Sequence, residues 1–300
     1  MKKLLILFLV LILCGSTIAG CSLASNNSNP TWTSQQSTTQ IRNVWGTSSS
    51  DVFAVGESGN IIHYDGKSWS TMTSGTTNAL YGVWGNSSHG VFAVGRQGTI
   101  LHYDGKTWSQ MTSGITTEID SVWGTSSSNV FALGPNIILH YNGNVWSSMN
   151  VPAVAFFESI WGTSPSNIFA VSDKGTIMHF DGSTWSNIGS GTTNQLLVVW
   201  GNSSSDIFAV GEFGTIMHYD GYAWSTMTSG LTNPLAGIWG SSSSDIFTVG
   251  PGGVILHYDG KTWSQWHMDT TNVFVAVWGT SSSNVYAVDG SGVIWHYSEN

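Results

Sequence analysis

Hydrophobic and polar positions along this chain follow a short-strand pattern that recurs through residues 31–300. In residues 79–85, ALYGVWG, apolar and small residues alternate, which predicts a first β-strand. Residues 91–95, VFAVG, are a continuous apolar run and predict a second strand. Residues 99–105, TILHYDG, predict a third strand, and residues 106–114, KTWSQMTSG, a fourth. Turn residues lie between these segments, so four short strands follow one another.

The same four-strand order returns every 38 or 39 residues. A Trp-Gly dipeptide marks the first strand of each copy, with its Trp at Trp45, Trp84, Trp123, Trp161, Trp200, Trp239 and Trp278. A second Trp marks the fourth strand, at Trp69, Trp108, Trp146, Trp185, Trp224 and Trp263. Seven copies of a four-stranded unit predict an all-β fold, a seven-bladed β-propeller with four antiparallel strands per blade.

The two ends of the repeat predict how the ring closes. The last copy ends with residues 292–300, GVIWHYSEN, after three predicted strands and without a second Trp. At the other end, Trp32 precedes Trp45 by 13 residues, close to the 15 that separate Trp69 from Trp84. We therefore expect the N-terminal strand to complete the last blade, which closes the ring and removes an exposed sheet edge.

Residues 1–20 have the features of an export signal. Lys2 and Lys3 precede an apolar run of eleven residues, which is too short to span a bilayer as a mature helix. Residues 17–21, TIAGC, resemble a bacterial lipobox, and this resemblance implies that Cys21 is lipidated and becomes the first mature residue. Ser22 follows it where an Asp would signal inner-membrane retention, so we expect the outer membrane in a cell with two. The alternative is an ordinary signal peptide with an unrelated Cys.

Residues 21–30 then form the lipidated Cys and a flexible polar tether, and residues 31–300 the propeller. Removal of the signal leaves Cys21 as the only Cys, so no internal disulfide forms. It also removes two of the eight basic residues, which leaves six against seventeen acidic residues, a net charge of −11. This sign excludes a protein that binds the nucleic-acid backbone. The lipid anchor is the only membrane contact that we expect.

One His recurs in every predicted third strand: His63, His102, His140, His179, His218, His257 and His296. Packed sheets lie about 10 Å apart whereas Zn–N bonds are about 2 Å, so residues placed one per blade do not converge on a metal. We predict no metal and no cofactor, and expect each His to bond the backbone or the Asp of the following hairpin. Asp65 is replaced by Asn142 and Asp51 by Asn129 in other copies, which is typical of turn formers rather than acid catalysts.

The segment HYDGKTWS at residues 102–109 resembles the Asp-box, Ser-x-Asp-x-Gly-x-Thr-Trp, of neuraminidase-type (BNR) propellers. It keeps Asp104, Gly105, Thr107 and Trp108 but lacks the leading Ser and the residue between Asp and Gly. The resemblance covers residues 31–300 as architecture, in a superfamily that includes sialidases, photosystem II assembly factors and secreted propellers. In that family the Asp-box is a peripheral fold element, so the resemblance implies a fold and not an active site.

Catalytic motifs do not emerge from the pattern. Sialidases hold the substrate carboxylate with three Arg, whereas Arg42 and Arg96 are the two Arg of this chain. No P-loop, zincin helix or Gly-x-Ser-x-Gly elbow occurs either. Trp266 and Trp295 replace smaller apolar residues of the repeat, and we expect them to add core packing. The sequence therefore predicts a protein that is not an enzyme.

Specificity is expected where the copies differ. The residue three before the Trp of each Trp-Gly is Arg42, Tyr81, Asp120, Glu158, Leu197, Ala236 or Val275. The turn between the second and third strands contains Glu57, Arg96, Pro135, Asp173, Lys174, Glu212, Phe213 and Pro251. Both sets fall on one rim of a propeller, around the mouth of the central channel, and the near-constant TSSS and DGK turns fall on the other. The alternative is that these exposed loops drift without function.

We therefore hypothesise a non-catalytic binding or scaffold propeller, monomeric, that binds a protein or glycan partner on one face. The candidate partner-binding residues are Arg42, Tyr81, Asp120, Glu158, Glu57, Arg96 and Lys174, with Arg42 and Tyr81 as anchors because Arg and Tyr are enriched in binding hot spots. One alternative is a lectin with repeated sites between blades. Another is a glycoside-processing enzyme.

Overall fold

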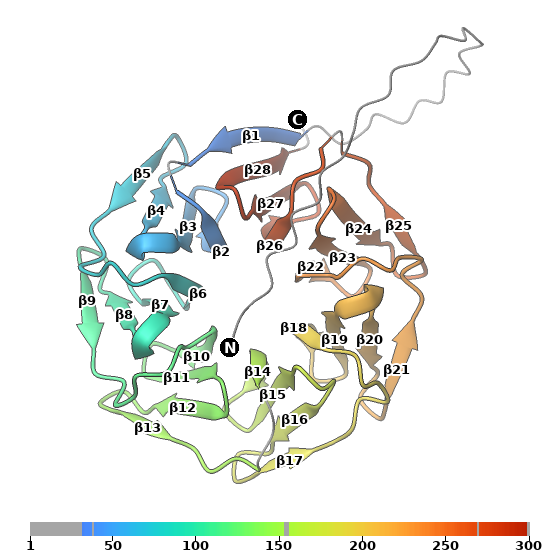
Figure 1. Ribbon diagram of the computed structural model, residues 1–300, viewed down its shortest axis with the longest axis horizontal. Helices are drawn as coiled ribbons and strands as arrows, with labels where there is room; N and C mark the ends of the chain where they lie inside the picture. The colour runs from blue at the N-terminus through green and yellow to red at the C-terminus, as the bar shows by residue number, and fades with distance from the viewer. Residues whose placement is uncertain (1–31, 38, 153–155, 269, 299–300) are drawn as a thin grey trace, which may run out of the picture. The chain divides into compact units, whose positions relative to one another are not determined.

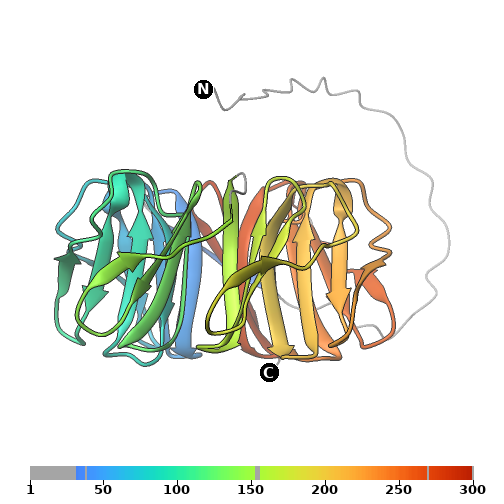
Figure 2. The same cartoon turned by 90° about the horizontal axis from the view of Figure 1, so that it is seen from below.

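A computed structural model of the chain describes residues 32–37, 39–152, 156–268 and 270–298. These residues form seven four-stranded antiparallel sheets arranged as blades around a common axis (Figure 1). Figure 2 shows the sheets side by side, with the strand ends gathered at two opposite rims. The predicted all-β, seven-bladed propeller is confirmed. Within the described residues no helix is long and apolar enough to cross a membrane.

The first four blades follow one another in chain order. Blade 1 contains β2 (Ile41–Ser48), β3 (Asp51–Gly56), β4 (Ile61–Tyr64) and β5 (Trp69–Met72). Blade 2 contains β6 (Leu80–Gly85), β7 (Val91–Gly95), β8 (Ile100–Tyr103) and β9 (Trp108–Met111). Blade 3 contains β10 (Ser121–Ser126), β11 (Asn129–Gly134), β12 (Ile137–Tyr141) and β13 (Trp146–Ser148). Blade 4 contains β14 (Phe157–Ser164), β15 (Asn167–Ser172), β16 (Ile177–Phe180) and β17 (Trp185–Asn187).

The remaining three blades keep the same order. Blade 5 contains β18 (Leu196–Ser203), β19 (Asp206–Gly211), β20 (Ile216–Tyr219) and β21 (Trp224–Met227). Blade 6 contains β22 (Gly237–Ser242), β23 (Asp245–Gly250), β24 (Val254–Tyr258) and β25 (Trp263–Gln265). Blade 7 contains β26 (Phe274–Ser281), β27 (Asn284–Asp289), β28 (Val293–Ser298) and β1 (Trp32–Gln36). Short 3-10 turns follow the second strand in blades 1, 2 and 5: η1 (Glu57–Gly59), η2 (Arg96–Gly98) and η3 (Glu212–Gly214).

Blade 7 joins the two ends of the described chain. The N-terminal strand β1 pairs antiparallel with β28, and Trp32 lies opposite Tyr297 with ring centroids 5.6 Å apart. The hydroxyl of Thr33 also donates to the carbonyl oxygen of His296 at 3.2 Å. The predicted ring closure is therefore confirmed, and β28 is not left as an open edge.

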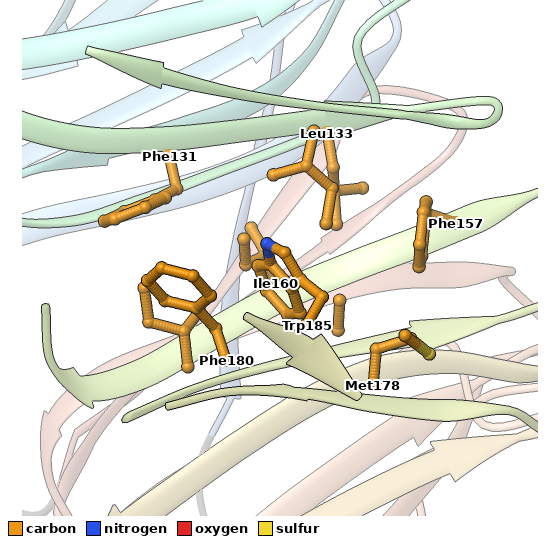
Figure 3. Close-up of a cluster of buried hydrophobic side chains, with 10 residues drawn as sticks. Phe131, Leu133, Phe157, Ile160, Met178, Phe180 and Trp185 are labelled. Atoms are coloured by element: carbon orange, nitrogen blue, oxygen red, sulfur yellow. The ribbon is translucent and has the colours of Figure 1, made fainter. Parts of the chain in front are cut away.

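Hydrophobic cores lie between neighbouring blades, as the core between blades 3 and 4 illustrates (Figure 3). Phe131 and Leu133 of β11 face Ile160 of β14 and Met178 of β16 across this junction. The second strands are buried on both faces, which explains their continuous apolar sequence. Burial of one such Phe contributes about 1.5–3 kcal/mol relative to an exposed position.

The Trp-Gly pair also connects neighbouring blades. At each junction the tip of the indole reaches the Gly of the following blade, so that a Cβ on Gly85 would lie 2.7 Å from Cη2 of Trp45. The last junction closes the series, because a Cβ on Gly46 would lie 2.7 Å from Cη2 of Trp278. Glycine is required here by the close approach of the indole. The repeated Trp-Gly is thus a packing element of the ring.

Trp266 and Trp295 both pack in the core between blades 6 and 7. The ring of Trp266 contacts those of Phe247 at 5.1 Å and Tyr297 at 5.3 Å between centroids. The indole Nε1 of Trp295 donates to the buried Asp289 at 3.3 Å. The expectation that these two Trp add core packing is confirmed.

Candidate functional site

The connections whose residues differ most between blades lie on one rim. The backbone N–H of Glu57, at the start of η1, donates to the carbonyl oxygen of Gln40 just before β2, at 3.0 Å. The same contact recurs in blade 2, between Arg96 and Ala79, at 2.9 Å. The second-to-third and fourth-to-first connections therefore meet, as the sequence predicted, and we call this surface the variable rim.

Short turns rich in Ser and Gly form the opposite rim, which we call the constant rim. A Cβ on Gly66 would lie 2.7 Å from the Cβ of Ser50, so the two turns of blade 1 are in contact there. Asp65 accepts the backbone N–H groups of Lys67 and Ser68 at 2.9 and 2.8 Å. These hydrogen bonds lower the pKa of Asp65, with the bond from Ser68 the larger cause. This Asp acts as a turn former.

An ion pair links the two variable connections of blade 1. The guanidinium of Arg42 donates to Oε1 of Glu57 from Nη2 at 2.6 Å and from Nε at 2.9 Å. The side chains are 41% and 34% exposed, so the pair contributes at most about 1 kcal/mol to stability. Both groups therefore remain accessible to a partner at little cost to the fold.

Tyr81 is influenced by charged side chains from blades 1 to 3. Burial raises the pKa of Tyr81 most, and the negative charge of Glu118 raises it further. Arg96 opposes this shift, while Glu57 and Asp120 add to it, so all four charges act on the Tyr81 hydroxyl. The structure thus brings five predicted residues to one sector, and we call Arg42, Glu57, Tyr81, Arg96, Glu118 and Asp120 the charged sector.

Glu118 was missed by the sequence reasoning. It lies two residues before Asp120 in the connection that leads into β10, where other blades carry Gln40, Ala79 or Gln195. A comparison of the seven copies at the position of Gln40 would have identified Glu118 as a charged residue that differs from its equivalents.

Glu158 and Lys174 lie on the variable rim of blade 4. Oε1 of Glu158 accepts a hydrogen bond from Nε2 of Gln195 at 2.8 Å, which links blade 4 to the connection entering blade 5. Lys174 is exposed in the turn after β15. These two residues continue the rim beyond the charged sector.

In blades 5 to 7 the variable rim carries apolar side chains at the entrance of the first strand, beside Glu212 of η3. Leu197, Ala236 and Val275 are half-buried at the position that carries Arg42 in blade 1. Phe213, in the middle of η3, is 68% exposed, and Val273 before β26 is 53% exposed. We call Leu197, Phe213, Ala236, Val273 and Val275 the apolar sector. At the position of Arg42 the rim therefore has a charged and an apolar side.

The expected partner of the repeated His was wrong. Nε2 of His63 donates to Oδ1 of Asp51 at 2.6 Å, and Nε2 of His179 to Oδ1 of Asn167 at 2.7 Å. The acceptor is the residue at the start of the second strand rather than the hairpin Asp. Because antiparallel pairing places Phe53 opposite His63, Asp51 lies within reach on the same blade.

His102 lacks such a partner, since Gly90 replaces the acceptor, and its Nε2 is buried without a hydrogen bond. Burial lowers its pKa. Elsewhere in the chain, no three His, Cys, Asp or Glu side chains among the described residues are grouped so that they could hold a metal ion.

Comparisons with known proteins support the class of protein that this geometry defines, a seven-bladed β-propeller. No protein-family model and no curated protein sequence matches the chain. One similar solved structure is "YCF48 bound to D1 peptide", with 17% identity and a TM-score of 0.76, covering 93% of this chain and 100% of that one. Another is YCF48 from Cyanidioschyzon merolae, with 13% identity and a TM-score of 0.72, covering 89% of this chain and 98% of that one. The WD40 β-propeller domain of Doa1 has 12% identity and a TM-score of 0.75 over 88% and 94%. At these identities the likeness shows the fold.

Proposed function

We propose that this protein is a non-catalytic propeller that binds a segment of a partner protein on its variable rim. The observation that carries the proposal is the division of that rim into a charged and an apolar sector. Arg42 and Tyr81 offer an accessible guanidinium and a phenol on one side, while Phe213 offers an exposed aromatic ring on the other. Arg and Tyr are enriched among the residues that dominate binding energy.

The chemistry of the two sectors suits a peptide with polar and apolar ends. Carboxylates of the charged sector favour a basic group on the partner, and Arg42 and Arg96 favour an acidic one, while Phe213 and Val273 favour aliphatic side chains. YCF48 bound to D1 peptide is a propeller of similar fold with a peptide ligand, and this likeness supports the assignment of a protein partner.

We also propose that the protein is exported from the cytoplasm. Residues 1–20 resemble an export signal and TIAGC resembles a lipobox, so Cys21 would carry a lipid that anchors the propeller to the envelope. Cys21 and the tether lie outside the described residues. A glycan remains the alternative partner, and a lectin with equivalent sites would bind about one ligand per blade.

A selection for binding peptides tests the assignment of the rim. A displayed library of random dodecapeptides is selected on the purified propeller, and the enriched peptides are titrated by calorimetry. We expect a stoichiometry of one peptide per chain. The double variant Arg42→Ala/Tyr81→Ala should weaken binding by roughly 1–3 kcal/mol, because it removes both anchors.

The matched control lies on the constant rim. Ser48→Ala/Lys106→Ala removes one polar and one cationic side chain there and should leave peptide affinity unchanged. If this control abolishes binding while Arg42→Ala/Tyr81→Ala does not, the binding surface has been assigned to the wrong rim. Binding of a neutral glycan at seven equivalent sites would instead favour the lectin.

A further inference from the structure

A cavity of about 430 Å³ lies between blades 4 and 5. Its walls come from Phe169 and His179 of blade 4, from Tyr219 and Trp224 of blade 5, and from the residues that follow β17. Ser204 and Tyr222, in turns of the constant rim, complete the lining. The volume falls in the range of pockets that hold small molecules.

The cavity occurs where the repeat loses a methionine. In blade 1 the fourth strand carries Met72, whose sulfur accepts a hydrogen bond from Nε1 of Trp108 of blade 2 at 3.5 Å, so this side chain fills the junction. The equivalent residue before Trp224 is Ile188. The indole Nε1 of Trp224 is buried without a hydrogen-bond partner. The indoles of Trp146, Trp185 and Trp263 are also unpaired, although the preceding blades keep the methionine, so the unpaired donor is not specific to this junction. What distinguishes the junction is the space beside Ile188.

The backbone after Ile188 also changes course. Gly189 has φ 65°, a left-handed conformation, and its N–H donates to Oδ1 of Asn187 at 2.9 Å. A Cβ on Gly189 would meet no atom within 4 Å, so the segment stands clear of the blade. Blades 1 and 5 have Thr73 and Thr228 at this position. Asn187, Ile188 and Gly189 therefore act together to open the junction.

A second junction supports this explanation. Between blades 7 and 1 the methionine position is Gln35, and a cavity of about 280 Å³ lies there beside Trp69, Tyr64 and His296. That cavity is lined by Lys67 at the position of Tyr222. Two junctions without the methionine thus have cavities. The mouth of one carries the cationic Lys67, and the mouth of the other carries the aromatic Tyr222.

The lining of the cavity between blades 4 and 5 is uncharged and mixed in character. Aromatic rings alternate with the hydroxyls of Ser190 and Ser204 and the amide of Asn167. The ring of His179 packs against that of Phe169 with centroids 4.7 Å apart and a tilt of 34°, and burial lowers the pKa of His179, which favours the neutral imidazole. Tyr222 is 93% exposed at the mouth, where blades 1, 2 and 6 carry Lys.

We infer that this cavity binds one residue of a neutral saccharide. A pyranose ring has apolar C–H faces that pack on aromatic rings, and a rim of hydroxyls that exchange hydrogen bonds with neutral donors and acceptors. Tyr222 and Trp224 supply aromatic surface, and the hydroxyls of Ser204 and Tyr222 supply polar groups. Ser190 and Asn167 are already bonded to Gly175 and His179, and they hold the wall of the cavity in place. An ionic ligand would find no counter-charge in this lining. The lining includes no residue of the charged sector or the apolar sector.

Saturation-transfer NMR on the full propeller tests the site with a panel of methyl pyranosides of neutral hexoses and N-acetylhexosamines. At about 10 mM ligand, a site with a dissociation constant near 1 mM is about 90% filled. We expect transfer to at least one neutral glycoside. The variant Tyr222→Lys introduces the residue of blades 1, 2 and 6 and should weaken binding about tenfold, because the aromatic platform is lost.

A second variant closes the cavity without departing from the repeat. Asn187→Thr/Ile188→Met/Gly189→Thr gives WSTMTSG, the sequence of blades 1 and 5, and should abolish saccharide binding while the melting temperature is retained or raised. Arg42→Ala/Tyr81→Ala should leave it unchanged, which separates this site from the peptide site. The inference is overturned if no neutral glycoside shows transfer, if transfer persists in the triple variant, or if phenol or indole is bound in preference to every glycoside.

Discussion

Single glycines determine how closely the blades approach one another. A Cβ on Gly201 would lie 2.6 Å from Cη2 of Trp161 and 2.9 Å from the carbonyl oxygen of Asp206. The indole belongs to the preceding blade and the carbonyl to the backbone, so neither moves away freely. The Trp-Gly pair therefore couples each blade to the next through one van der Waals contact that only glycine permits.

We predict that Gly201→Ala destabilises the ring by about 3 kcal/mol, because the added methyl overpacks the junction. Gly75→Ala is the control, since Gly75 has φ 76° and its Cβ would meet nothing within 4 Å. That change should cost only about 1 kcal/mol, from the left-handed backbone. Urea unfolding followed by Trp fluorescence measures both values. Equal costs at the two positions would show that the indole contact is not limiting.

At the residue scale, the sequence predicted where the repeated residues lie, but not which residues they form hydrogen bonds with. The repeat identified all seven His. The hairpin Asp and the Asp at the start of the second strand are both replaced by Asn in some copies, so the sequence did not show which of them bonds the His. Strand register decides it, because the pairing of Val52 with Tyr64 brings Asp51 near His63. Glu118 was missed for a related reason, since its approach to Tyr81 depends on how blade 2 faces blade 3.

At the element scale, the end of β27 carries the largest local departure from the repeat. Asp289 is fully buried where blades 1, 2 and 3 have Gly56, Gly95 and Gly134. Its carboxylate accepts hydrogen bonds from Ser291, Val293, Trp295 and Asn272. Burial alone would raise the pKa of Asp289, but these hydrogen bonds outweigh it and hold the pKa below its ordinary value.

We predict that Asp289→Asn lowers the free energy of unfolding at pH 7 by roughly 2–3 kcal/mol, because buried donors lose a charged acceptor. The folded pKa lies below the unfolded value, so the stabilisation is complete above about pH 3.9 and is lost as the pH falls through the folded pKa. Urea titrations between pH 7 and pH 3 should show the gap between wild type and variant narrowing only at the acid end. If the difference in free energy of unfolding between wild type and Asp289→Asn does not change with pH, the loss of stability results from packing and not from the carboxylate charge.

Strand order and ring closure were also predictable at this scale, because they follow from the position of the second Trp. The cavity between blades 4 and 5 was not predicted. Ile188 in place of methionine is visible in the sequence, but its effect depends on the indole of the next blade and on the left-handed Gly189. The structural effect of a single substitution in a repeat can be predicted only when the residue it packs against in the neighbouring blade is known.

At the scale of the whole molecule, the two proposed binding sites use different residues. Peptide binding is proposed on the variable rim and saccharide binding between the outer parts of blades 4 and 5, so both could be occupied together. The proposal of the first site rests on a feature that is visible in the sequence, the divergence of the copies in charge. Under the proposed lipid anchor, residues 22–30 would be a polar tether of up to about 30 Å when extended.

The proposed lipid anchor gives the last prediction. Wild-type protein expressed in bacteria should sediment with membranes and resist a high-salt wash, because acyl chains and not charges hold it there. Cys21→Ser removes the only site for the lipid and should shift the protein to the soluble fraction. Cys14→Ser is the matched control, since Cys14 lies in the apolar run that is removed with the signal, and it should remain with the membranes. Retention of the Cys21→Ser protein after the wash would show that another contact anchors the propeller.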